Sequence, residues 1–154
     1  MEKEFVPYEQ ALELKEIGFG RKCFGYHYTL DGKNWKFAYS EEFRRIDDEF
    51  NIGLKFMLLS PTFSQAFRWF REKYNIAHSI DWMKRIGGEY PSGYIVHFRG
   101  INGNILNKDD LIVLNNTEFP GYEVFPTYEE VELACLKKLI EMAKTKQHDK
   151  ENIA

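Results

Sequence analysis

The sequence predicts an α+β fold, with a mainly antiparallel sheet of about five or six strands packed against two or three helices. Three observations predict it: helical spacing of apolar residues in some segments, two-residue alternation in others, and short turn sequences between the alternating segments. Strands joined by tight turns favour antiparallel pairing. The 154 residues suit a single domain. We expect it to cover residues 1–146, with a disordered polar tail over 147–154.

Three segments have helical character. Residues 8–17 are followed by Gly18, which suits the left-handed backbone that often ends a helix. In the second helix, after Pro61, the pair Thr62 and Gln65 resembles a capping box, and Trp69 falls on the polar face.

The third helix is the C-terminal one. Thr127 is suited to cap it, and Glu130 stands three places later, as in a capping box. Tyr128 begins an apolar stripe that continues with Val131 and Cys135. We therefore expect Tyr128 and Cys135 to face the core.

A hairpin is predicted for residues 23–30 and 33–39. Asp31-Gly32 between two runs of strand-forming residues indicates a type I′ turn. Residues 40–50 are ambiguous between a short helix and a loop. Further strands are predicted at 55–59, 76–83, 94–99, 111–114 and 122–125.

Composition excludes several classes of protein. The net charge of -3 provides no overall basic field, so generic nucleic-acid binding is not expected. Cys23 and Cys135 form no zinc-binding pattern, and we expect no metal or other cofactor. No apolar run has the length of a membrane span or a signal peptide, which favours the cytoplasm. Aromatic residues make up 16% of the chain, so some rings should line a groove or an interface.

Three stretches resemble a known group of proteins. Residues 5–16, 61–74 and 128–140 are similar to an uncharacterised family of small proteins encoded by bacteriophages and prophages. The resemblance implies an accessory role in the bacterial host cell, such as inhibition of a host enzyme, counter-defence or capture of a nucleotide signal. It carries no catalytic residue onto this chain.

Histidines are the main candidates for catalysis. His78 and His97 lie on two predicted strands and would come close if those strands paired, where two imidazoles could bind a metal or transfer a proton. No carboxylate or cysteine stands at ligand spacing, so structural histidines are the simpler interpretation. The acidic run Asp47-Asp48-Glu49 is best explained as a solvated surface.

Cations beside aromatic rings form the main candidate binding site. The residues are Arg68, Trp69, Arg71, Trp82 and Arg85. Arginine next to an exposed ring can bind phosphate and stack on a base, and an exposed Trp can anchor a protein contact. The alternative is that Trp69 packs under another element while the cations stay in water.

The sequence therefore favours a non-catalytic binding module, possible as a homo-oligomer, that captures a host protein or a small anionic ligand of the nucleotide type. A small hydrolase or nuclease using His78 and His97 is the enzymatic alternative. A structural component of a virion is a third hypothesis.

Overall fold

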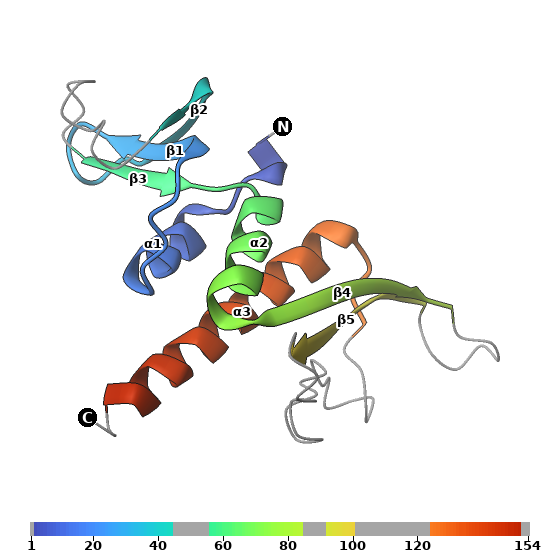
Figure 1. Cartoon of the computed structure of the whole chain (residues 1–154). Coiled ribbons are helices and arrows are strands. Elements are labelled where there is room, and N and C mark those ends of the chain that lie inside the picture. Colours follow the sequence, from blue (N-terminus) through green and yellow to red (C-terminus); the bar gives the residue numbers. More distant parts are fainter. Residues whose placement is uncertain (1, 45–55, 85–91, 101–123, 152–154) are drawn as a thin grey trace. The chain divides into compact units, whose positions relative to one another are not determined.

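The α+β class is confirmed by the computed structural model, which describes residues 2–44, 56–84, 92–100 and 124–151 (Figure 1). The elements are η1 (Glu2–Glu4), α1 (Tyr8–Glu16), β1 (Cys23–Thr29), β2 (Lys36–Arg44), β3 (Phe56–Ser60), α2 (Phe63–Tyr74), β4 (Ile76–Met83), β5 (Gly93–Gly100) and α3 (Tyr128–Glu151).

The strands form two small sheets. In the described ranges a three-stranded antiparallel sheet has the order β2-β1-β3, and β4 pairs with β5 as a separate antiparallel ribbon. The expected single sheet of five or six strands is therefore wrong. The predicted strand 111–114 lies outside the described residues, and of 122–125 only the last two positions are described.

The chain forms two compact units. Unit 1 contains Met1–Trp69 and Leu139–Ala154, and unit 2 contains Phe70–Lys138. Helix α3 continues to Glu151, beyond the domain end that was expected at position 146. The single-domain boundary itself stays a prediction.

In unit 1, the N-terminal segment crosses the three-stranded sheet. The backbone N–H of Val6 donates to the carbonyl of Pro61 at 2.9 Å, and the Val6 carbonyl accepts from Ser60 Oγ at 2.7 Å. Nε2 of the buried His27 lies 3.3 Å from the same carbonyl and must donate to it, because a carbonyl only accepts. Burial, which outweighs this hydrogen bond, lowers the pKa of His27.

The β1–β2 hairpin is confirmed, but its turn is not type I′. Gly32 has a positive φ of 77°. A type I′ turn also needs a positive φ at Asp31, and the φ of Asp31 is not positive. The loop is held instead by the Asp31 carboxylate. Oδ1 accepts from the backbone N–H groups of Lys33 and Asn34, both at 2.9 Å, and from Thr29 Oγ1 at 2.8 Å. These hydrogen bonds lower the pKa of Asp31.

Strand β2 also corrects the expectation for residues 40–50. It continues to Arg44, so the first part of this segment is a strand and neither a helix nor a loop. Positions 45–50 lie outside the described residues. Strand β3, with buried Met57, Leu58 and Leu59, confirms the strand predicted at 55–59.

Helix α1 ends as its sequence predicts. Gly18 has φ 86°, the N–H of Phe19 donates to the Leu14 carbonyl at 2.8 Å, and the N–H of Gly18 donates to Lys15 at 3.0 Å. This hydrogen-bond pair is the Schellman motif. It turns the chain so that Phe19, which is 4% exposed, enters the core of unit 1.

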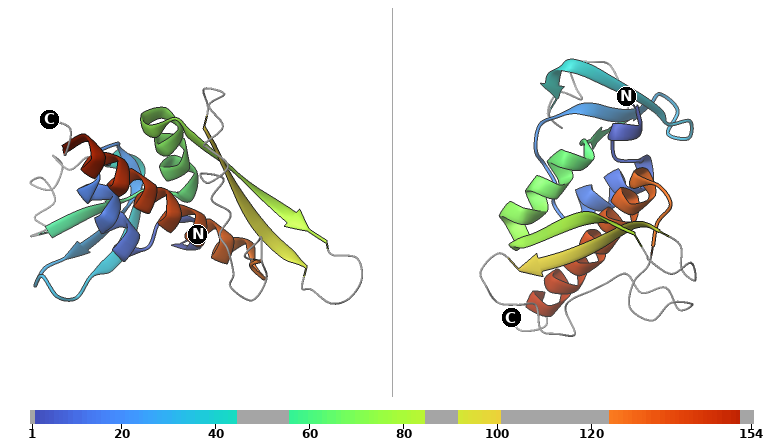
Figure 2. Two further views of the ribbon diagram at one scale, coloured as in Figure 1. Left: turned by 90° about the horizontal axis from the view of Figure 1, so that it is seen from below. Right: turned by 90° about the vertical axis from the view of Figure 1, so that its right-hand side faces the viewer.

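The C-terminal half of α3 lies beside α1 (Figure 2). Lys144 Nζ lies 2.7 Å from Glu13 Oε2 and 3.7 Å from Glu16 Oε2, and Gln147 Nε2 donates to the Ile17 carbonyl at 3.1 Å. Leu139, Ile140 and Ala143, on the same half of α3, are buried. Because these polar contacts join the two helices, they fix the end of α1 to α3.

Helix α2 begins with the capping box expected from its sequence. The Thr62 N–H donates to Gln65 Oε1 at 3.0 Å, and the Gln65 N–H donates to Thr62 Oγ1 at 3.2 Å. Two orphan N–H groups of the helix terminus are thereby satisfied. Helix α3 shows one such bond, from the Glu130 N–H to Thr127 Oγ1 at 3.3 Å.

Candidate functional site

The structure divides the five residues predicted as a binding site. Arg68 and Arg71 are exposed on α2, Trp82 is exposed on β4, and Arg85 lies outside the described residues. Trp69 is only 4% exposed, and its ring meets Phe19 edge-to-face at 5.3 Å between centroids. The contact role expected for Trp69 is therefore corrected, because its ring belongs to the core of unit 1. The alternative, in which Trp69 packs under another element while the cations stay in water, is what the structure shows.

Trp82 is the predicted site residue whose ring remains on the surface. It is 56% exposed, and it pairs across the β4–β5 ribbon with Tyr94. The two rings meet edge-to-face at 4.9 Å between centroids. This contact orients the indole while leaving more than half of it in solvent.

A third ring joins this pair from the start of α3. Tyr128 lies edge-to-face against Tyr94 at 5.5 Å and is 45% exposed, which corrects the expectation that it faces the core. Its position explains the difference, because the first residue of a helix lies beyond the part of the stripe that the core covers. Val131 and Cys135, further along the stripe, are buried as expected. We call Trp82, Tyr94 and Tyr128 the aromatic cluster.

The backbone near Phe125 positions this cluster. Phe125 and Tyr94 exchange two backbone hydrogen bonds, at 2.8 and 2.9 Å, in an isolated antiparallel bridge. A Cβ atom on Gly93 would lie 2.5 Å from the Phe125 carbonyl oxygen, so this close approach requires glycine. Three residues after the bridge, the chain enters α3 at Tyr128. The bridge therefore brings the start of the helix beside the ribbon.

Three glutamates follow Tyr128 closely in the sequence of α3. Glu129 and Glu130 are exposed in the first turn of α3, and Glu132, which follows, is partly exposed. Burial, and then the Glu132 charge, raise the pKa of Tyr128, so its phenol stays neutral at physiological pH. The negative charge of Glu132 therefore acts on the Tyr128 end of the cluster.

The two candidate catalytic histidines do not form a joint site. His78 pairs with Phe98, and His97 pairs with Ser79, the residue after His78. Because successive residues of a strand point to opposite faces, His78 and His97 lie on opposite faces of the ribbon. Burial, and then the Arg71 charge, lower the pKa of His78 to about 4, so it is neutral at pH 7.

Ser79 and Asp81 lie near His97, on the same face of the ribbon. Ser79 Oγ donates to Asp81 Oδ2 at 3.1 Å, and His97 Nε2 lies 3.8 Å from the same oxygen. A nucleophilic serine needs its hydroxyl bonded to an imidazole base. Here the hydroxyl is bonded to the carboxylate, so the three residues lack the hydrogen-bond order of a catalytic triad.

The thiols also lack the environment of a nucleophile. Cys23 and Cys135 are both free and fully buried. Burial raises the pKa of Cys23 to about 12 and also raises that of Cys135. Both sulfurs are therefore protonated at neutral pH, whereas reactive cysteines are exposed thiolates.

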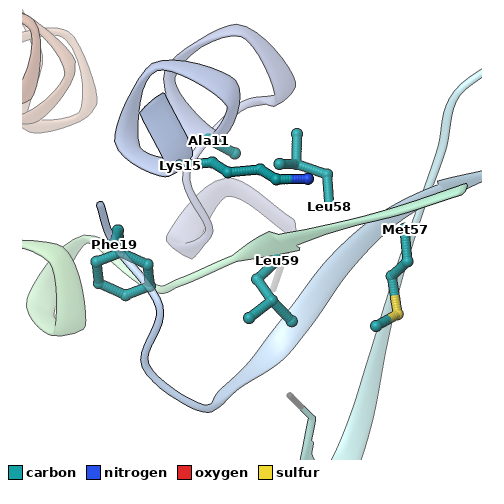
Figure 3. A pocket seen from close by; sticks show the side chains of 6 residues that line it. All are labelled: Ala11, Lys15, Phe19, Met57, Leu58 and Leu59. Carbon is teal, nitrogen blue, oxygen red and sulfur yellow. The ribbon is translucent and has the colours of Figure 1, made fainter. Parts of the chain in front are cut away.

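Hollows are lined by described residues of unit 1 in at least two places. The first has a volume of about 10 Å³ between α1 and β3, where Leu58 points toward Lys15, and Met57 and Leu59 point to the other side of the strand (Figure 3). It has room for about one water molecule and no larger ligand. The second, about 340 Å³, is an open hollow beside the β1–β2 loop, lined by Tyr28, Leu30, Asn34 and Lys36 among others.

The described residues contain neither a candidate metal cluster nor a candidate membrane helix. Within residues 2–44, 56–84, 92–100 and 124–151, no three His, Cys, Asp or Glu side chains are grouped so that they could hold a metal ion. No helix there combines the length and the apolar character that crossing a membrane requires. Comparisons of the chain with protein-family models, curated proteins and solved structures found no match.

Proposed function

We propose that this chain is a non-catalytic binding module that captures a protein partner through the aromatic cluster. The observation that carries the proposal is the 56% exposure of Trp82 on a ring-to-ring contact with Tyr94. Trp and Tyr are the residues most often found as energetic anchors of protein interfaces. An oriented ring also loses little side-chain entropy on binding, which favours affinity.

The chemistry of the described side chains supports binding over catalysis. His78 and His97 lie on opposite faces, the Ser79 hydroxyl is bonded to Asp81, and both thiols are buried. The hydrolase or nuclease alternative depended on His78 and His97 acting together. Its geometric support is therefore lost.

The sequence resemblance supplies the setting of the proposal. A phage accessory or counter-defence protein would act in the cytoplasm of the bacterial host cell, and its partner would be a host protein. Arg68, Trp69 and Arg71 were expected among the contact residues for either a host protein or a small anionic ligand of the nucleotide type, which could stack on an exposed ring. Because Trp69 is buried, that ligand loses its stacking surface, and a protein partner is the better-supported class.

The test is a quantitative capture experiment with the full chain. Wild-type protein, Trp82→Ala and Tyr39→Ala are immobilised and exposed to bacterial lysate, and retained proteins are measured by mass spectrometry. Tyr39 is a matched control, since it is 55% exposed but lies on β2 in unit 1, whereas the three cluster residues belong to unit 2. We expect specific partners to be retained by wild type and Tyr39→Ala, and to fall at least about tenfold on Trp82→Ala.

Equal retention by Trp82→Ala and wild type would contradict the proposal. The melting temperature is the folding control, and it should change by no more than about 2 °C on replacing so exposed a ring. A defined ring or filament of the chain alone would instead support the virion hypothesis.

A further inference from the structure

We infer that the aromatic cluster receives a cationic segment of its partner, with an arginine or lysine side chain placed over Trp82 or Tyr128. This inference rests on the proposed function and names the chemistry of the partner. Its grounds are the exposed ring faces and the carboxylates at the start of α3.

The rings present the surface that a cation needs. Tyr94 meets Trp82 and Tyr128 edge-to-face, at interplanar angles of 73° and 82°. The exposed fractions of Trp82 and Tyr128 leave ring surface open to solvent. The electron-rich face of an indole is the best aromatic partner for a guanidinium or an ammonium group.

The negative charges at the start of α3 also favour a positively charged ligand. Glu129, Glu130 and Glu132 all lie within four residues of Tyr128, which is roughly 6 Å along the helix axis. Among the described residues, the exposed Lys84 directly follows β4, two positions after Trp82, and Lys137 stands more than two turns further along α3. Of these charges, that of Glu132 acts on the Tyr128 ring directly, since it raises the pKa of the phenol after burial does.

The same carboxylates disfavour an anionic ligand. A phosphate placed on Tyr128 would meet the like charge of Glu132, and this repulsion costs affinity. An arginine can instead stack on a ring while its fork-shaped group pairs with a carboxylate. The cluster therefore distinguishes partners by charge as well as by shape.

The experiment uses three short blocked peptides that differ in charge: Gly-Arg-Gly-Arg-Gly, its citrulline analogue and Gly-Glu-Gly-Glu-Gly. Binding to the full-length protein is followed by NMR chemical shifts and by calorimetry. We expect the arginine peptide to bind at least about threefold more tightly than the citrulline peptide. The glutamate peptide should be weakest, and raising the salt concentration should weaken the arginine peptide selectively.

Variants separate the ring from its bulk and from the charge. Trp82→Phe should keep most of the affinity for the arginine peptide, whereas Trp82→Leu, which keeps an apolar side chain, should lose it. The double variant Glu129→Gln, Glu130→Gln should reduce the preference for arginine over citrulline. Tyr39→Ala should change nothing.

Equal binding of the three peptides, or equal binding by Trp82→Leu and wild type, would overturn the inference. If the arginine preference is absent while Trp82→Ala still releases the lysate partners, the charge selectivity fails and the proposed function stands. If Trp82→Ala releases no partner, the proposed function itself fails.

Discussion

Two tryptophans of this chain stand in similar sequence surroundings but in opposite environments. Trp69 is flanked by Arg68 and Arg71, and Trp82 is followed by Lys84 and Arg85. Trp69 is 4% exposed and Trp82 is 56% exposed. The difference teaches that neighbouring cations do not decide where a ring lies. The decisive feature is a distant partner, since Phe19 covers Trp69, whereas the rings around Trp82 orient it without enclosing it.

The largest expected effect is on the buried tryptophan. Trp69→Ala removes a ring from the core of unit 1 and leaves a cavity, so we expect it to lower the free energy of unfolding by about 3–5 kcal/mol. Chemical denaturation measures this loss. Trp82→Ala is the matched substitution and should cost less than about 1 kcal/mol. Similar losses for both variants would break the contrast between the two rings.

A smaller effect is expected at the glycine that positions the exposed cluster. Gly93→Ala places a Cβ against the Phe125 carbonyl, and we expect a loss of about 1–3 kcal/mol with weaker partner capture. Gly20→Ala is the control, because a Cβ there meets no heavy atom within 4 Å. If both variants are equally stable, the bridge does not hold the cluster in place.

The pH dependence of stability tests the burial of His78 on β4. His78 and Trp82 share a face of β4, but burial lowers the pKa of His78 from 6.5 to about 4. Between these values the unfolded state binds more protons, so the free energy of unfolding should fall as the pH drops from about 6.5 to about 4. Above that window His78 contributes no pH dependence.

The size of this fall is roughly 1–2 kcal/mol after allowing for partial exposure of the side chain. His27 acts in the same direction, because burial lowers its pKa as well. Urea denaturation at pH 7 and pH 4.5 measures the sum of both. His78→Gln should lose part of the fall, and an unchanged fall in this variant would show that His78 is not the group responsible.

Features set by a few neighbouring residues were predicted from the sequence. The Schellman end of α1 at Gly18 and the capping box of Thr62 and Gln65 depend on residues within one helical turn. The hairpin was predicted correctly, but the type I′ turn predicted for it was wrong. The side chain of Asp31 makes enough hydrogen bonds to hold a longer loop, so a positive φ at Asp31 is not needed.

Features set by remote segments were not predicted. The division into two sheets depends on which strands pair, and alternation within a strand does not specify its neighbour. The burial of Trp69 depends on Phe19, and the exposed cluster depends on the Tyr94–Phe125 bridge. The position of Trp69 on the polar face of α2 gave no indication that Phe19 would pack against its ring. A hint of the cluster existed in the aromatic pair Trp82 and Tyr94 on adjacent predicted strands.

The docking of α3 on α1 has a consequence for folding during synthesis. Lys144 and Gln147 bind α1 residues that precede them by about 130 positions, so unit 1 stays incomplete until the whole of unit 2 has been translated. A nascent chain ending before residue 139 would lack Lys144 and Gln147, and with them the polar contacts to Glu13 and Glu16 of α1 and to the Ile17 carbonyl. Helix α1 can therefore form its contacts with Lys144 and Gln147 only after most of the chain has been synthesised.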